Sequence, residues 1–359
     1  MPRNLHDGIP RVSRWLRPLE GHAWRSLRPL VVLCASCFPA LAGGVRCVAS
    51  EPFEIRIVDR ENQWPVPGVE LKTTHNVRFI SDNAGRIAFD LPELMNVQTW
   101  LHVLGHGYSV PTDGFGYSGV RLVPRPGQSV TIEVDRELPA KRLGRITGGG
   151  LFAESQKLGK EPEWTEQGIL GCDSVQNAVH GGKLFWSWGD TILAGYPLGR
   201  FHMIGATTAL QPIDVFRPPI RLRYDYFVDA EQVPRNIAVM PGTGPTWLSG
   251  FASLPDREGK HHLVASYSKI EPPLSEYERG LCIWNESESK FERSLVLWTR
   301  SKESTKPMMS PTGHAVFTVG PNGDRWVSFG DPFPSLRCRA TLEAWSDPSQ
   351  WEVLQPQES

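Results

Sequence analysis

The chain has 359 residues, of which 40% are hydrophobic and 21% are charged, and this composition excludes a disordered polar tail. Its length is enough to bury a sizeable core in about two domains. The formal net charge is −1; the first fifty residues contribute +5 through seven arginines and two acids, so the remainder carries about −6. Because no basic stripe is present, nucleic acid is not expected as a partner.

The residue types favour an all-β protein. Glycine, proline and tryptophan are frequent, at 34, 31 and 13 residues, and the apolar runs are short. Few long stretches show the helical periodicity that marks an amphipathic helix. Short apolar runs divided by many turn residues are typical of all-β folds.

Residues 1–50 have the pattern of an export signal. Six arginines precede an apolar run at 30–45, and small residues at 48–50 stand before Glu51. This order predicts a signal peptide and a secreted, periplasmic or cell-surface location. The apolar run is shorter than the roughly 20 residues that a membrane-spanning helix needs. No stable membrane span is therefore expected, and an uncleaved anchor is the alternative.

Residues 51–142 are predicted to form a β-sandwich. Apolar and polar residues alternate at 53–59, as in a half-buried strand. Further strands are expected near 69–71, 77–80, 87–89, 100–103 and 130–134, about seven in all. The order Val-x-Asp, Pro-x-Pro-Gly-Val and Ser-Asp-x-x-Gly-Arg-Ile-x-Phe, then Gly-Tyr, resembles the transthyretin-like domains found beside carboxypeptidases and in secreted bacterial proteins. That resemblance implies an immunoglobulin-like sandwich without catalytic residues.

The stretch after residue 142 is predicted to join two domains. Pro139 ends the last predicted strand, and three glycines at 148–150 open the next part. The charged residues at 151–170 indicate an exposed loop. His102 and His106 have an H-x-x-x-H spacing, but Gly105 and Gly107 disfavour the helix that would place both on one face, so no metal site is expected there.

Three cysteines follow the signal, namely Cys172, Cys282 and Cys338. At most one disulfide can form among them, which excludes a disulfide-based scaffold. Cys172 is either a nucleophile or a small buried side chain. The second is favoured because no histidine forms a recognisable partner motif.

Two short strands at 174–179 and 183–188 are predicted to form a hairpin through a Gly-Gly turn. Asp173 precedes the first strand and Asp190 follows the second, so antiparallel pairing brings both carboxylates to one edge of the sheet. That edge is the predicted place for chemistry. The alternative is that both acids only accept hydrogen bonds from turn backbone.

A short motif occurs twice in the second half of the chain. Ser-Trp-Gly-Asp ends at Asp190, and Ser-Phe-Gly-Asp ends at Asp331. Strands are expected between the two at 247–253, 262–267, 280–284 and 291–298. Four-stranded units with recurring glycine and aromatic residues are typical of β-propeller blades. The spacing predicts units of about 70 residues.

The same region carries a second resemblance. Gly-x-Asp-Ser, Gly-Lys-Leu-Phe-Trp-x-Trp-Gly-Asp-Thr, Gly-His and the ending Asp-Pro-Ser-Gln-Trp-Glu are similar to five-bladed propeller domains of secreted bacterial proteins. Those domains are similar in pattern to glycosidases that act on arabinans, xylans and fructans. The resemblance places a propeller-type domain at 143–359 and implies carbohydrate as the partner.

The resemblance also implies a role for each of three acids. Asp173 matches the acid at the start of an inner strand and would be the catalytic base or nucleophile. Asp190 and Asp331 stand at strand ends and would fix turns by accepting backbone N–H bonds. No cofactor or metal is expected, although such a funnel could hold a calcium ion.

Four residues are candidates for sugar binding under this resemblance. They are Trp186, Trp188, Trp247 and His314. Indole rings stack on sugars, but tryptophans at alternate strand positions also fill the space between blades. Both interpretations remain open from the sequence.

A complete propeller does not fit in the chain. The stretch from 171 to 359 is too short for three units of about 70 residues. A missing segment or a partner would have to cover the open sheet edges, and the chain is expected to be inactive as a fragment. Two classes of function therefore remain: a glycoside hydrolase-like enzyme with no identifiable acid partner, and a non-catalytic glycan-binding or structural module.

Overall fold

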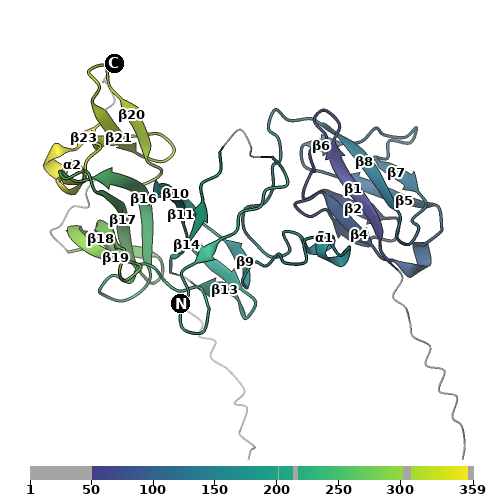
Figure 1. The fold of residues 1–359 in the computed structure, drawn as a ribbon, viewed down its shortest axis with the longest axis horizontal. Helices are drawn as coiled ribbons and strands as arrows, with labels where there is room; N and C mark the ends of the chain where they lie inside the picture. The colour runs from purple at the N-terminus through teal and green to yellow at the C-terminus, as the bar shows by residue number, and fades with distance from the viewer. Residues whose placement is uncertain (1–50, 201, 213–216, 302–308, 355–359) are drawn as a thin grey trace, which may run out of the picture. The chain divides into compact units, whose positions relative to one another are not determined.

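The computed structural model describes residues 51–200, 202–212, 217–301 and 309–354 (Figure 1). It is 46% strand and 6% helix, which confirms the prediction of an all-β protein. Within these ranges, no helix has the length and apolar character needed to cross a bilayer. The predicted export signal at 1–50 lies outside the described residues.

The first eight strands form two four-stranded sheets, in the orders β4-β1-β8-β6 and β3-β2-β5-β7. The strands are β1 (Phe53–Asp59), β2 (Glu70–Thr73), β3 (Arg78–Ile80), β4 (Arg86–Phe89), β5 (Thr99–Leu104), β6 (Tyr108–Ser109), β7 (Gly119–Leu122) and β8 (Ser129–Arg136). β1 pairs antiparallel with β4 and parallel with β8. The strand predicted at 53–59 is confirmed at both ends, and each of the other strands expected here is found close to its predicted position.

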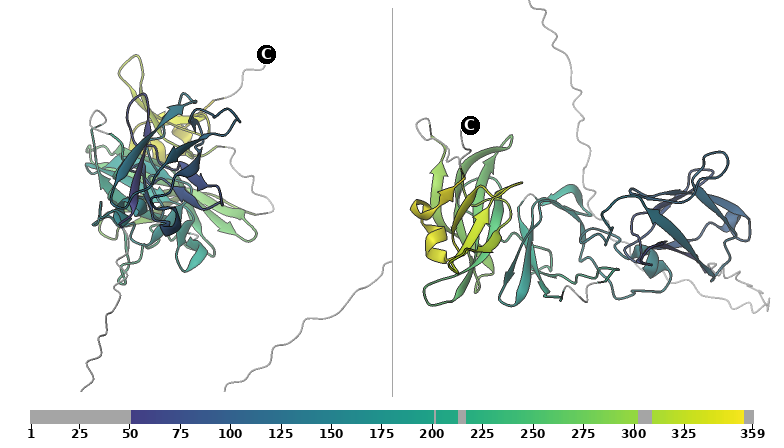
Figure 2. Two further views of the ribbon diagram at one scale, coloured as in Figure 1. Left: turned by 90° about the vertical axis from the view of Figure 1, so that its right-hand side faces the viewer. Right: turned by 90° about the horizontal axis from the view of Figure 1, so that it is seen from above.

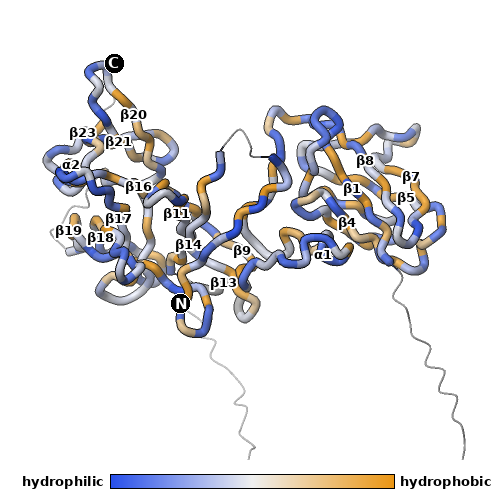
Figure 3. The backbone as a smooth tube through the Cα atoms, viewed as in Figure 1, coloured by the Kyte–Doolittle hydropathy of each residue, from blue (hydrophilic) through white to orange (hydrophobic). Residues whose placement is uncertain are grey.

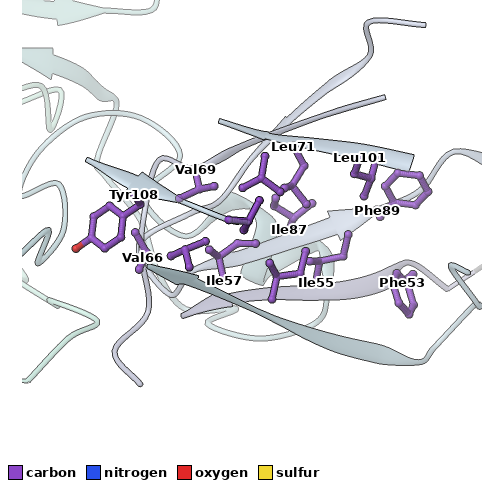
Figure 4. Close-up of a cluster of buried hydrophobic side chains, with 14 residues drawn as sticks. Phe53, Ile55, Ile57, Val66, Val69, Leu71, Ile87, Phe89, Leu101 and Tyr108 are labelled. Carbon is purple, nitrogen blue, oxygen red and sulfur yellow. The ribbon is translucent and has the colours of Figure 1, made fainter. Parts of the chain in front are cut away.

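One apolar cluster fills the space between these two sheets. Ile55 and Ile57 of β1 enter it from one sheet, and Leu71 of β2 and Leu101 of β5 enter it from the other. All four side chains are fully buried, and Figure 4 shows them meeting between the strands. Alternate residues of a strand point to opposite faces, so the apolar alternation along β1 is what builds its side of this core.

The segment after residue 142 packs onto the first two sheets. Helix α1 (Ala153–Lys157) follows Phe152, whose ring is fully buried with its centroid 4.6 Å from that of Trp164. Both rings belong to a small apolar cluster with Ala84. The prediction of an exposed loop at 151–170 is therefore wrong for this stretch, because its few apolar residues are the ones that become buried.

Polar contacts fix the same segment. The backbone N–H of Ser155 donates to the carboxylate of Asp82 at 2.7 Å, and the ammonium of Lys160 lies 2.7 Å from the carboxylate of Glu54. Asp82 is 3% exposed, so its charge is compensated by backbone donors instead of water. Residues up to Trp164 therefore pack with the first two sheets.

Three four-stranded antiparallel sheets follow, each with its strands in chain order: β10-β11-β14-β15, β16-β17-β18-β19 and β20-β21-β22-β23. A further sheet has the order β13-β12-β9. The strands are β9 (Ile169–Cys172), β10 (Gln176–His180), β11 (Lys183–Trp188), β12 (Thr191–Leu193), β13 (Tyr196–Arg200), β14 (Ile204–Ala209), β15 (Asp225–Tyr226), β16 (Thr246–Pro255), β17 (His261–Glu271), β18 (Ser275–Asn285), β19 (Lys290–Thr299), β20 (Val316–Val319), β21 (Arg325–Phe329), β22 (Leu336–Arg339) and β23 (Glu352–Val353). The remaining helices are α2 (Leu342–Ser346) and the short 3-10 turns η1 (Pro92–Leu94) and η3 (Pro348–Gln350).

These three sheets recur at a constant interval. Their first strands begin at Gln176, Thr246 and Val316, so the step from the first sheet to the second equals the step from the second to the third. This interval agrees with the predicted unit length, and the repeated motif falls at the end of the second strand of the first and third sheets, β11 and β21. The prediction that fewer than three units fit is wrong, because the third sheet is complete within residues 316–353.

The sheet β16-β17-β18-β19 is buried on both faces. Leu248 and Leu263 pack into a cluster that includes Phe185 of β11. Val264 packs on the opposite side, into a cluster that includes Val327 of β21. Figure 2 shows the strands of this region from two further sides, and Figure 3 shows hydrophobic residues both in strands and in the segments that connect them. Each of the three sheets therefore shares a core with the next one along the chain.

Candidate functional site

A groove of about 660 Å³ lies where the first strands of the three sheets come together. We call it the first-strand groove. Its wall consists of residues 177–182 with Phe251, Ser253, His261, Ala315, Phe317 and Arg325. β10, β16 and β20 are all edge strands of their sheets, so the groove is built from backbone edges and from the side chains beside them.

A tight hairpin positions His180 at this groove. His180 ends β10 and pairs with Lys183 of β11 across Gly181 and Gly182. The two glycines have φ values of +56° and +74°, in the left-handed region that a two-residue hairpin turn requires and that other residues rarely adopt. The Gly-Gly turn predicted from the sequence is thus confirmed.

The His180 ring bridges two sheets. Its Nδ1 lies 2.9 Å from Oγ of Ser253 on β16, and its Nε2 lies 2.9 Å from Oε1 of Glu286, just after β18. The His180 side chain is 11% exposed and that of Glu286 is 70% exposed. Because a carboxylate only accepts hydrogen bonds, Nε2 donates to Glu286; in the neutral form of the ring, Nδ1 is then the acceptor that faces the Ser253 hydroxyl.

Two further side chains hold this hydrogen-bonded chain. Nδ1 of His261 lies 3.3 Å from Oγ of Ser253. The indole N–H of Trp284 donates to Oε2 of Glu286 at 3.1 Å. An exposed glutamate would otherwise sample several rotamers, so the indole favours the orientation that reaches His180.

The rest of the groove wall combines apolar and charged groups. Phe317 of β20 is 48% exposed, whereas Phe251 of β16 is buried beneath the groove. Arg325 at the start of β21 is exposed. The groove thus offers donors, acceptors, a cation and an aromatic face.

Asp173 and Asp190 also lie together, at the end of β10 opposite to His180. The backbone N–H of Asp173 donates to the carbonyl of Asp190 at 3.0 Å, and the hydroxyl of Ser174 donates to the Asp173 carboxylate at 3.1 Å. Burial, and secondarily the neighbouring Asp173 charge, raise the pKa of Asp190. The antiparallel pairing thus brings the two acids to one edge, as expected, but neither lines the first-strand groove.

The two predicted turn acids differ in their surroundings. Asp190 is partly buried, and Asp331 is exposed just after β21. Within the described ranges, no backbone N–H donates to either carboxylate. The expected turn-fixing hydrogen bonds are therefore not found among these residues.

Two of the tryptophans expected as sugar platforms are buried. Trp186 and Trp188 are 7% and 1% exposed, with ring centroids 6.0 Å apart and planes parallel within 1°. Tyr224 packs edge-on against both rings. Their faces contact protein, which agrees with the alternative that such tryptophans fill interior space. Trp247 is partly buried against the cluster that includes Phe185.

His314 and the cysteines add no reactive group to the groove. His314 is exposed and precedes β20, next to a residue of the groove wall. All three described cysteines are free, and burial raises the pKa of Cys172 to about 11. Its thiol therefore stays protonated near neutral pH, which disfavours the interpretation as a nucleophile, and its side chain is partly buried. In the part of the chain that the structure describes, no cluster of His, Cys, Asp or Glu could hold a metal ion.

Comparison with protein-family models, curated proteins and solved structures finds no match for this chain. The sequence also does not single out the residues of the first-strand groove. Ser253 and Glu286 lie 73 and 106 residues from His180, so no local spacing marks them. Only the Gly-Gly turn beside His180 gives a signal at this place.

Proposed function

We propose that this chain is an exported, glycan-related protein that binds carbohydrate in the first-strand groove. The observation that carries the proposal is the composition of the groove wall: hydroxyl, imidazole and guanidinium groups beside the half-exposed ring of Phe317. Sugars present hydroxyl groups at their edges and an apolar C–H face, and a site for them combines polar groups with an aromatic surface.

We further propose that the sheets of residues 51–142 form a transthyretin-like spacer domain, onto which the segment up to Trp164 packs, and that the sheets that follow within residues 143–359 form part of a five-bladed type of propeller. Two sheets around one core support the first assignment. The constant interval between first strands and the shared cores of successive sheets support the second. In a propeller the first strand of each blade faces the central funnel, and the first-strand groove would then be the funnel wall.

The surface of β20 fits a propeller that is completed by further sheets. All four residues of this strand are exposed, including Val316 at 45% and Val319 at 70%. Exposed apolar side chains of this kind fit the packing of a further sheet against a face of β20, which leaves its backbone edge at the groove. A partner or an additional segment would cover that face.

A glycosidase-like activity is the second candidate. Here Asp173 would be the base or nucleophile, as the sequence resemblance implies. Burial raises the pKa of the adjacent Asp190, which is the direction of shift that the general acid of such a hydrolase needs. The third candidate is a structural module of the cell surface with no glycan site.

Binding of the full chain to arabinan, xylan and fructan oligosaccharides by calorimetry tests these functions. Phe317→Ala is expected to weaken binding about tenfold, from loss of an aromatic contact worth roughly 1.4 kcal/mol. Phe333→Ala is the matched control, since Phe333 is 78% exposed and outside the groove. Loss of turnover only in Asp173→Asn would favour the glycosidase, and no binding to any of the three would overturn the proposal.

A further inference from the structure

A serine and a histidine of the groove wall are joined in series with a carboxylate beside the groove, that of Glu286. The distances from Ser253 Oγ to His180 Nδ1 and from His180 Nε2 to Glu286 Oε1 are both 2.9 Å. The three residues come from β16, β10 and the turn after β18. Such a series is the arrangement in which a base activates a hydroxyl nucleophile and a third group orients the base.

The hydrogen-bond partners fit the tautomer required for that chemistry. Glu286 accepts a hydrogen bond from Nε2–H, so in the neutral ring the lone pair of Nδ1 faces the Ser253 hydroxyl. His261 lies 3.3 Å from the same oxygen and can donate to it without competing for its proton. Ser253 is one of the residues that line the groove, so a ligand bound there lies beside this residue.

We propose that the first-strand groove hydrolyses carboxylic esters, with Ser253 as the nucleophile, His180 as the general base and Glu286 as a positioning residue. Ser253 Oγ bonds to the ester carbonyl carbon while His180 Nδ1 takes the hydroxyl proton. The tetrahedral intermediate then releases the alcohol, which receives that proton from His180. Water, deprotonated by His180, cleaves the resulting acyl-serine and regenerates the hydroxyl with release of the carboxylic acid.

Groups that could stabilise the oxyanion lie in the same wall. Arg325 supplies a guanidinium, and the turn at Gly181 and Gly182 presents backbone at the groove. Donors aimed at the developing negative charge supply a large share of catalysis in acyl transfer. A groove of about 660 Å³ accommodates an ester of a small acyl group on a larger alcohol.

Ester hydrolysis would take place in the groove of the proposed function but does not depend on a glycan as its ligand. Esters of sugars are one class of substrate, and simple aryl esters are another with the same reactive carbonyl. Ester hydrolysis and glycan binding are measured separately, so either can fail while the other holds.

The test uses the full chain with p-nitrophenyl acetate as substrate and a fluorophosphonate as covalent probe. We expect wild type to be labelled at Ser253, as located by peptide mass spectrometry. Ser253→Ala should lose the label and lower kcat/KM by about a hundredfold or more, as should His180→Gln. Labelling of the wild type requires no variant to fold, so a failure to label Ser253 overturns the proposal outright.

Glu286 has a separate readout because it does not touch the substrate. Glu286→Gln should lower kcat roughly tenfold with KM and the melting temperature unchanged. Glu286→Asp keeps the carboxylate and should retain more of the wild-type kcat than Glu286→Gln does. Ser268→Ala and His262→Gln are matched controls, each removing a side chain that hydrogen-bonds a carboxylate away from Ser253. Equal hydrolysis in Ser253→Ala and wild type would assign the activity to other groups and contradict the proposal.

Discussion

Nδ1 of His180 and Oγ of Ser253 lie 2.9 Å apart and join the first two of the three repeated sheets. Each residue belongs to an edge strand, β10 or β16. The distance between these two atoms therefore depends on how the first sheet packs against the second. The apolar cluster beneath, which includes Phe185 and Phe251 from the same two sheets, sets that placement.

Gly250 should be much less tolerant of substitution than Gly259. Both have positive φ, +69° and +81°, so alanine costs each about 1–2 kcal/mol in backbone strain. A Cβ at Gly250 would lie 2.0 Å from the carbonyl oxygen of Pro311, whereas one at Gly259 meets nothing within 4 Å. We expect Gly250→Ala to destabilise by more than about 3 kcal/mol, because overpacking against backbone adds to the strain.

Urea unfolding of both variants measures this difference. Gly259→Ala isolates the cost of the backbone conformation, and the excess in Gly250→Ala is the cost of crowding. Equal losses in the two variants would mean that the loop at Pro311 moves away from β16 without penalty.

Phe152→Ala should destabilise the chain by about 3–5 kcal/mol, as expected for a large side chain removed from a packed interior. Phe152 is fully buried against Trp164. Phe115→Ala is the control, since Phe115 is 90% exposed, and it should change the free energy of unfolding by less than about 0.5 kcal/mol. An equally small effect of Phe152→Ala would contradict its burial and would support the exposed loop that the charges at 151–170 predict.

The sequence predicts strands well where alternation is regular, and poorly where few apolar residues do the packing. β1 follows directly from alternation at 53–59, and the length of the repeated unit follows from the motif that recurs at Asp190 and Asp331. Phe152 and Trp164 stand among charged residues, so no period marks them as buried. Their burial depends on a surface at Ala84, which only the folded first two sheets provide.

The candidate site shows the same limit more strongly. The sequence favours Asp173 because its neighbours form a motif, but the groove is formed by side chains far apart in sequence. The distance between Ser253 and His180 depends on register, turn geometry and sheet packing together. A spacing pattern within one strand or helix cannot predict a distance between residues of two different sheets.

Lys269→Met should destabilise the chain by about 1–3 kcal/mol at pH 7, because methionine keeps much of the volume but leaves buried acceptors without their donor. Lys269 is 1% exposed, and its ammonium donates to the carbonyl of Gly244 at 2.8 Å and to those of Met240 and Gly242 at 3.3 Å. Loss of stability in urea unfolding checks this, with Lys72→Met as a control on β2.

The contribution of Lys269 should also depend on pH. Burial lowers its pKa in the folded state below the ordinary value of 10.5, so the unfolded chain binds the proton more tightly between these two pKa values. Stability from this group therefore rises with pH through that window. The difference between wild type and Lys269→Met should grow from pH 7 to pH 10, and a constant difference would show that the ammonium is not desolvated.

Asp190→Asn should stabilise the chain at pH 7, by up to about 1 kcal/mol. Burial and the charge of Asp173 raise the pKa of Asp190 above its ordinary value of 3.8, so folding favours its protonated form. The stability from that protonated form is fully present below the unfolded pKa and is lost as pH rises through the folded pKa. Asparagine mimics the protonated acid, so the gain in stability should vanish below about pH 3.8.

Asp173→Asn is the companion variant and should give a smaller gain in stability, because it removes only the neighbouring charge. Urea unfolding of both variants between pH 3 and pH 7 measures these gains. If Asp190 instead fixes a turn, Asp190→Asn should lower the stability at pH 7.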